Sequence, residues 1–155
     1  MSDASWRPTA AHDTLKARAD LLRSVRAFFD GRGVMEVSTP LLAAHGVSDE
    51  HIDAIEVPGH GWLQTSPEYH MKRLLAAGSG PIYQIARAFR HGEAGARHNP
   101  EFTLLEWYRP GFDLEALVDE CLALLGPLCG AGAERRRFRE LFAAVTGLDP
   151  LTAPA

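Results

Sequence analysis

Hydrophobic positions recur at helical spacing in the first part of the chain. Between residues 13 and 30, apolar side chains follow one another at intervals of four and three, which predicts a helix with one apolar face. The positions that define this face are Leu15, Ala19, Leu22, Val25 and Phe29. We expect Asp13 or Thr14 to cap the start of this helix, and Gly31 and Gly33 to end it.

Short extended runs and a second helix follow the first helix. Residues 34–39 lead into Pro40, and because the residue before a proline avoids helical angles, we predict that they are extended. Residues 62–65 have the pattern of a second strand. The next helix is predicted to begin with Ser66 as its cap, to have a proline in its first turn, and to continue through Leu75.

The middle of the chain has the pattern of an antiparallel hairpin. Residues 82–90 and 102–109 read as strands, and the polar residues 91–101 form a long loop between them. Side chains alternate between the two faces of a strand, so the residues that share a face can be written down. One face of the first strand carries Gln84, Ala86 and Arg90, and one face of the second carries Phe102, Leu104, Glu106 and Tyr108.

Two more helical patterns occupy the C-terminal part of the chain. We predict helices over residues 113–125, with Asp113 as the cap, and over residues 134–146, with a linker of residues 126–133 between them. The three arginines at positions 135–137 fit a solvated face of the last helix. The side chains expected to point inward from that helix are Phe138, Leu141, Phe142 and Val145.

The order of these elements predicts an α+β fold in which an antiparallel sheet is flanked by helices. Residues 1–12 form an N-terminal segment, and residues 13–155 form the domain. The composition agrees with a globular chain, since 46% of the residues are hydrophobic and 23% are charged. No apolar run approaches the roughly 20 residues that a membrane helix needs, so we expect no membrane association.

The net charge and the cysteines bear on the class of protein and on its compartment. The net charge is −4 and the isoelectric point is about 5.9, so the chain as a whole does not resemble a nucleic-acid binder. The two cysteines, Cys121 and Cys129, have no metal-ligand spacing and fit a reduced, cytoplasmic compartment.

The loop of the predicted hairpin is the first candidate site. Arg90 ends a strand, and more polar and basic groups follow it, which suits the binding of a polyphosphate because phosphoryl oxygens need donors aimed at their charge. These loop residues are His91, Glu93, Arg97, His98 and Asn99. A solvated hairpin tip with weak surface ion pairs is the alternative, and the spacing alone favours it.

Carboxylates near the hairpin are the second candidate site. Glu106 and Tyr108 share one face of a strand and could bind an ammonium group together, and Glu68 at a helix start could face the same cavity. The alternatives are a salt-bridged glutamate on a half-buried strand and a glutamate that compensates the helix dipole.

Two stretches of the chain resemble a known family. Residues 62–75 read WLQTSPEYHMKRLL and residues 89–110 read FRHGEAGARHNPEFTLLEWYRP. Both resemble the lysyl-tRNA synthetase-like enzymes that modify elongation factor P, the elongation factor P–(R)-β-lysine ligases. Residues 26–40, RAFFDGRGVMEVSTP, resemble motif 1 of class II aminoacyl-tRNA synthetases, which forms the dimer interface in that class. The hairpin resembles motif 2.

The resemblance implies an adenylate-forming ligase. ATP and lysine or β-lysine bind on the sheet, the amino-acid carboxylate attacks the α-phosphate, and pyrophosphate leaves. A lysine side chain of elongation factor P then accepts the aminoacyl group, and Mg²⁺ accompanies ATP. The resemblance makes Arg90 the catalytic contact to the α-phosphate. Its further implied ATP contacts are His91, Gly92, Glu93, Asn99 and, stacked on adenine, Phe102.

The resemblance also implies an amino-acid site. Glu106 and Tyr108 would meet the side-chain ammonium of lysine, and Ser66, Pro67 and Glu68 would contact the rest of the substrate, with Glu68 near its backbone amine. A buried charged partner explains selectivity, because a ligand without the amine leaves the carboxylate unpaired.

The chain departs from the family pattern in two ways. Motif 2 usually has a glutamate two residues after its arginine, where this chain has Gly92, and the glutamate follows at Glu93. Motif 3, a glycine-rich strand and helix with an adenine-stacking arginine, does not occur in these 155 residues, and neither do the later acidic residues that complete the lysine and Mg²⁺ sites. We therefore expect the N-terminal half of a ligase, truncated before motif 3 and without metal ligands of its own.

Two alternatives to the ligase remain. A lysyl-tRNA synthetase fragment is one, but too few residues precede Asp13 for an anticodon-binding barrel, and the charge does not suggest a tRNA surface, so tRNA is an unlikely partner. The other is a catalytically incomplete synthetase-like module that dimerises or binds nucleotide.

We predict that these 155 residues alone do not form an adenylate efficiently, because the resemblance assigns part of the ATP site to motif 3. ATP–pyrophosphate exchange with the 155-residue polypeptide should be far slower than with a complete ligase. Equal exchange rates would contradict this expectation.

Overall fold

The computed structural model describes residues 6–130, 132 and 134–152. They fall into two compact units, one within residues 1–112 and one within residues 113–155. The N-terminal unit contains both sheets and two helices, and the C-terminal unit contains two helices.

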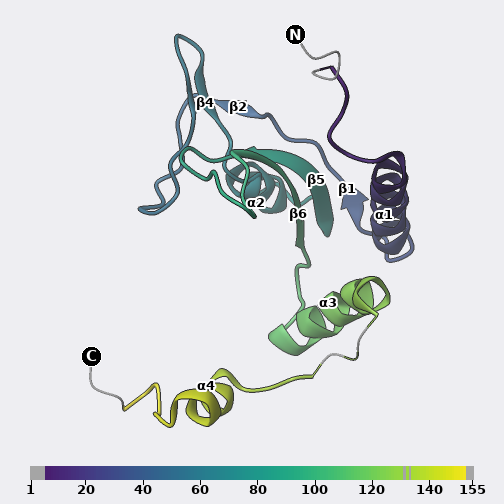
Figure 1. Ribbon diagram of the computed structural model, residues 1–155, viewed down its shortest axis with the longest axis vertical. Helices are drawn as coiled ribbons and strands as arrows, with labels where there is room; N and C mark the ends of the chain where they lie inside the picture. Colours follow the sequence, from purple (N-terminus) through teal and green to yellow (C-terminus); the bar gives the residue numbers. More distant parts are fainter. Residues whose placement is uncertain (1–5, 131, 133, 153–155) are drawn as a thin grey trace. The chain divides into compact units, whose positions relative to one another are not determined.

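The main sheet has three strands in the order β1-β5-β6 (Figure 1). β5 (Ile82–Phe89) and β6 (Glu101–Tyr108) are antiparallel over eight residue pairs, from Ile82 opposite Tyr108 to Phe89 opposite Glu101. β1 (Met35–Glu36) pairs in parallel with the start of β5. The predicted hairpin is therefore confirmed, whereas only two residues of the predicted strand over residues 34–39 are in the sheet.

A second, smaller sheet joins β2 (Leu42–Ala43), β4 (Gly61–Leu63) and β3 (Glu56–Val57) in antiparallel order. The sequence predicted β4 but neither of its two short partners. Gly61 has φ of 127°, and a Cβ at this position would collide with the backbone oxygen of Ala43. The close pairing of β2 with β4 therefore requires glycine here.

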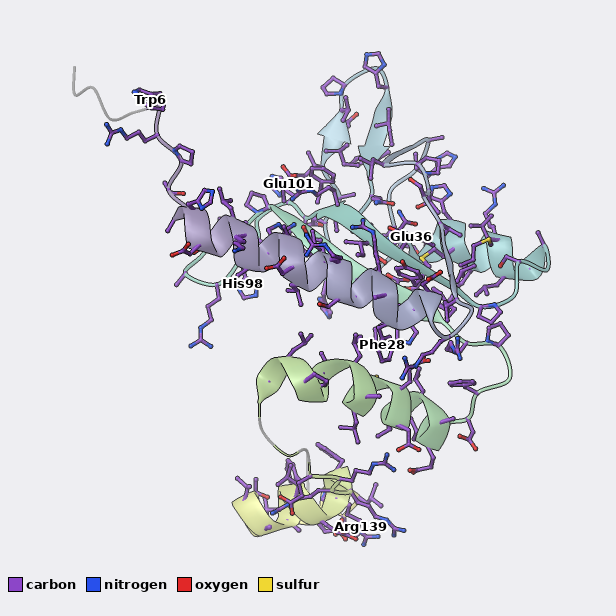
Figure 2. The ribbon with its side chains drawn as sticks, turned by 90° about the vertical axis from the view of Figure 1, so that its right-hand side faces the viewer. Trp6, Phe28, Glu36, His98, Glu101 and Arg139 are labelled. Carbon is purple, nitrogen blue, oxygen red and sulfur yellow. The ribbon has the colours of Figure 1, made fainter. Side chains whose placement is uncertain are left out.

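α1 (His12–Asp30) lies across one face of the hairpin, as Figure 2 shows with Phe28 near the end of the helix. The buried Phe29 ring stacks on Tyr83 of β5 with 4.5 Å between the ring centroids and lies 5.6 Å from Trp107 of β6. Towards the other end of the helix, Arg18 donates a hydrogen bond of 2.9 Å to the hydroxyl of Thr103. These contacts make the odd-numbered face of the hairpin the face that binds α1.

The start of α1 differs from the prediction. Ala11 occupies the N-cap position and provides no side-chain hydrogen bond, so the expected caps Asp13 and Thr14 are wrong because both residues lie inside the first turn. The helix ends at Gly31 as predicted, and Gly33 has φ of 65°, which suits the turn towards β1.

α2 (Glu68–Ala76) follows β4 and buries Met71 completely. Pro67 occupies its N-cap position, so the prediction of Ser66 as the cap is wrong by one residue. The hydroxyl of Ser66 nevertheless accepts the N–H of Glu68 at 3.1 Å, and thus pairs one of the free donors of the first turn.

The C-terminal unit contains α3 (Leu114–Cys129) and α4 (Phe138–Thr146). Asp113 caps α3 as predicted and accepts the N–H of Ala116 at 2.8 Å. α3 is one turn longer than predicted because it continues past Pro127, which the sequence reading placed in a linker.

The start and the inward face of α4 also differ from the prediction. The helix begins only at Phe138, so the three arginines at positions 135–137 precede it, and Arg135 pairs with Glu115 and Asp119 of α3. Phe138 and Val145, expected to point inward, are 72% and 78% exposed. Within the described part of the chain, none of the helices has the length and apolar character needed to cross a bilayer.

We predict that Phe29→Ala destabilises the fold by about 3–5 kcal/mol, because it removes a fully buried ring from between α1 and the hairpin. The matched control is Leu15→Ala on the same helix, where the side chain is 49% exposed and the expected loss is below about 0.5 kcal/mol. Urea unfolding of the three proteins measures both values. Equal losses for the two variants would contradict the packing of α1 described here.

Candidate active site

The even-numbered face of the hairpin, opposite the α1 contacts, carries the candidate site. Residues directly opposite each other in an antiparallel pair share a face. Gln84 faces Glu106, Ala86 faces Leu104 and Ala88 faces Phe102, so the prediction of which residues share a face is confirmed.

Two cavities lie along this face, and we call them the inner cavity and the tip cavity. The inner cavity has a volume of about 300 Å³, and the tip cavity has a volume of about 280 Å³. The inner cavity is lined by Val47, Asp49, Ile52, Thr65, Ser66, Glu68, Tyr69, Arg90, Leu104 and Glu106. The tip cavity is lined by Arg90, Glu93, Arg97, His98, Asn99 and Phe102. Arg90 lines both cavities.

Glu106 is held by two hydroxyl groups in the inner cavity. Ser66 donates to one carboxylate oxygen and Tyr108 donates to the other, each at 2.6 Å. A carboxylate has about four acceptor positions, so two bound hydroxyls fix its orientation and leave room for a cationic ligand. Burial, and next the hydrogen bond to Glu106, raise the pKa of the Tyr108 phenol well above its ordinary value, which keeps it a donor.

Glu68 lies at the start of α2 on the wall of the same cavity. One of its carboxylate oxygens accepts a hydrogen bond of 2.5 Å from Lys72, four residues later in the helix. This hydrogen bond, and next the negative charge of Glu68, raise the pKa of Lys72. Glu68 therefore faces the cavity with part of its charge already paired.

Arg90 stands at the junction because the backbone around it is fixed. The N–H of Phe89 bonds to the carbonyl of Gln64 at 2.9 Å, and the N–H of Arg90 itself bonds to the carbonyl of Pro100 at 2.9 Å. Its guanidinium lies 5.0 Å from the ring centroid of Phe102 and 3.3 Å from a carboxylate oxygen of Glu93. The side chain is 24% exposed, so the cation is partly desolvated and its hydrogen bonds are stronger than on an open surface.

The unusual loop sequence after Arg90 has a local structural explanation. Gly92 has φ of 78°, a conformation that suits glycine and turns the chain. The carboxylate one position later, Glu93, is the one that reaches Arg90. His91 bonds through its backbone N–H to the carbonyl of Asp53 at 2.8 Å, which ties the loop to the segment before β3. The one-residue displacement of the glutamate is therefore compatible with an arginine–glutamate pair.

The structure brings together most of the residues that the sequence singled out. Those that line a cavity are Ser66, Glu68, Arg90, Glu93, Asn99, Phe102 and Glu106. Four others do not line either one. Pro67 is fully buried, Tyr108 lies behind Glu106 as its hydrogen-bond donor, and His91 and Gly92 form the turn beside the tip cavity.

Sequence reasoning missed one wall of the inner cavity. Val47, Asp49 and Ile52 come from the segment between β2 and β3, which the sequence showed only as a mixed stretch with turns. Arg97 and His98 of the tip cavity were visible as basic loop residues, but only the resemblance selected loop residues for specific roles. His98 and the first residue of β6, Glu101, are labelled in Figure 2.

The described residues do not fit a resident metal ion. Among them, no group of three or more His, Cys, Asp or Glu side chains converges on one point. We therefore assign no step to Mg²⁺ through these side chains.

Comparison with known proteins identifies the family of the chain. Residues 4–129 match the family of tRNA synthetases class II (D, K and N). Since the match covers most of the chain, the protein belongs to this family of class II synthetases.

Curated relatives narrow the comparison further. The chain is 53% identical over 165 residues to the elongation factor P–(R)-β-lysine ligase of Pseudoalteromonas translucida, covering 99% of this chain and 50% of the relative. It is 51% identical over 162 residues to the ligase of the same name from Vibrio cholerae, and 49% identical over 160 residues to that from Mannheimia succiniciproducens. Each of these two alignments covers 97% of this chain and 50% of the relative. The chain thus spans about half the length of the curated relatives it matches.

We predict that the Tyr108 phenol remains neutral at about pH 11, where an ordinary tyrosine is mostly ionised. A raised pKa in the folded state favours the neutral phenol, so its contribution to stability is complete below about pH 10 and is lost as the pH rises through the folded pKa. The difference in phenolate absorbance between the wild type and Tyr108→Phe, both checked as folded, measures this ionisation. A half-ionised phenol near pH 10 would contradict the hydrogen bond to Glu106.

Proposed function

We propose that this protein activates lysine or β-lysine with ATP as an aminoacyl-adenylate and transfers it to a lysine side chain of elongation factor P. The relatives that carry this name are about half identical to the chain over nearly its whole length. The structural observation that carries the proposal is the position of Arg90, which lines both the inner and the tip cavity.

The inner cavity suits the amino acid. Glu106, fixed by Ser66 and Tyr108, presents a partly desolvated carboxylate to the side-chain ammonium. Glu68 and Ser66 line the same cavity and would contact the end of the substrate that carries the reacting carboxylate. Selectivity for an amine follows because a ligand without it would leave the Glu106 carboxylate without a cation.

The tip cavity suits ATP. Arg90 and Arg97 provide guanidinium donors for phosphate oxygens, and Asn99 adds an amide. The Phe102 ring in the same cavity offers a face for adenine. The amino-acid carboxylate must reach the α-phosphate to form the adenylate. The α-phosphate would therefore lie at Arg90, which lines both cavities.

This arrangement supports a two-step transfer. In the first step the amino-acid carboxylate attacks the α-phosphorus and pyrophosphate leaves, while Arg90 stabilises the charge that develops on the phosphoryl oxygens. In the second step the neutral side-chain amine of an elongation factor P lysine attacks the activated carbonyl. An amide bond forms, and AMP leaves.

The organisation of the whole protein is part of the same proposal. Residues 13–155 form the N-terminal part of the catalytic domain, and the protein acts in the cytoplasm as a homodimer through motif 1. The motif 1 segment joins α1 to β1, where Arg26 donates to both carboxylate oxygens of Glu36 at 3.1 and 3.0 Å. Exposed apolar side chains at Met35 in β1 and at Leu41, directly after the motif 1 segment, support an interface at this place.

We expect the full-length protein to add one lysine-type residue to elongation factor P in the presence of ATP, as measured by mass spectrometry with each lysine isomer in turn. Arg90→Ala should slow adenylate formation by about 100-fold or more, measured as ATP–pyrophosphate exchange. Arg87→Ala is the matched control, because Arg87 lies three residues earlier, within β5, has a side chain that is 53% exposed, and lines neither cavity. No mass gain with any isomer, or equal exchange rates in the two variants, would contradict the proposal.

A further inference from the structure

The segment between β2 and β3 forms a wall of the inner cavity that the proposed function leaves without a role. Val47, Asp49 and Ile52 of this segment line the cavity together with residues of α2 and the hairpin. A side-chain hydrogen bond of 3.1 Å between the hydroxyls of Ser48 and Tyr69 ties the segment to α2. Since Tyr69 itself lines the cavity, this bond fixes the wall at the place where a ligand would be held.

The inner cavity is lined by more carboxylates than one ammonium group needs as partners. Its lining includes three carboxylates, those of Asp49, Glu68 and Glu106, and one guanidinium, that of Arg90. A diamino acid carries two ammonium groups and one carboxylate. In the proposed function Arg90 binds the α-phosphate and Glu106 pairs with the side-chain ammonium, so the second ammonium group falls to one of the two remaining carboxylates, Glu68 or Asp49.

Of the two remaining carboxylates, Glu68 is already engaged by Lys72 at 2.5 Å. Asp49 uses one oxygen to accept the backbone N–H of His51 at 3.0 Å, a neutral partner that orients the carboxylate without cancelling its charge. It therefore offers a full negative charge on the wall that the Ser48–Tyr69 bond holds in place.

We propose that Asp49 is a substrate-binding residue that recognises the second ammonium group of the diamino acid, the one on C2 or C3 near the reacting carboxylate. The inference rests on the proposed function, because it takes a diamino acid as the ligand of the inner cavity. Asp49 thereby makes the site selective for a substrate with two amines over one with a terminal amine alone.

The test compares two ligands that differ only in this group. (R)-β-lysine has amines on C3 and C6, whereas 6-aminohexanoate has only the C6 amine. In the full-length protein, Asp49→Asn should weaken the binding of β-lysine by about tenfold or more, as expected for a lost charge-assisted hydrogen bond. The binding of 6-aminohexanoate should change by less than about twofold. Calorimetric titration, or competition where binding is weak, measures both.

Three further variants serve as controls for this comparison. Glu50→Gln removes the neighbouring exposed carboxylate, which does not line the cavity, and should leave both affinities unchanged. Glu106→Gln should weaken both ligands, because both carry the C6 amine. Tyr69→Phe removes the tie to Ser48 and should reproduce part of the Asp49→Asn effect on β-lysine only.

The outcomes separate this inference from the proposed function. If the wild type binds β-lysine and Asp49→Asn weakens both ligands equally, or neither, the role of Asp49 is overturned while the proposed function stands. If the wild type binds neither β-lysine nor lysine, both are overturned.

Discussion

The register of β5 against β6 is the constraint on which the rest of the N-terminal unit depends. It pairs Tyr83 with Trp107 on the face that receives Phe29 of α1, and Gln84 with Glu106 on the opposite face. A register slip of one residue would move the side chains of a strand to the opposite face of the hairpin. The aromatic residues that contact α1 would then face the cavities. The packing of α1 therefore stabilises the hairpin in the same register that assembles the candidate site.

The same constraint explains how one strand serves two cavities. β6 carries Phe102 near the loop and Glu106 near its other end, on one face and four residues apart. Arg90, just beyond the end of β5, lines both cavities, and its guanidinium lies 5.0 Å from the ring centroid of Phe102. A flat stacking surface, a cation and a fixed carboxylate thus line the cavities on one side of the hairpin. These are the three kinds of partner that the adenine, the phosphate and the amine of an aminoacyl-adenylate require.

Local pattern was sufficient for the hairpin and the position of most helices, because alternation and helical periodicity act over neighbouring residues. Local pattern failed where contacts between distant residues determine the secondary structure. β2 and β3 are two-residue strands that form by pairing with β4. Local pattern also ended α3 too early, because proline lacks a helical N–H donor, yet the helix continues past Pro127 to Cys129. The wall containing Asp49 was missed for the same reason as the short strands, since no periodicity marks it and only the tertiary fold brings it to the cavity.

The central claim is that Arg90 joins an amino-acid cavity to a nucleotide cavity on one face of the hairpin. A crystal structure of the full-length protein with a non-hydrolysable lysyl-adenylate mimic, such as the sulfamoyl analogue, tests it most directly. We expect the terminal amine at Glu106, the sulfamoyl group at Arg90 and the adenine against Phe102. An analogue bound in the reverse direction, or away from the two cavities, would contradict it.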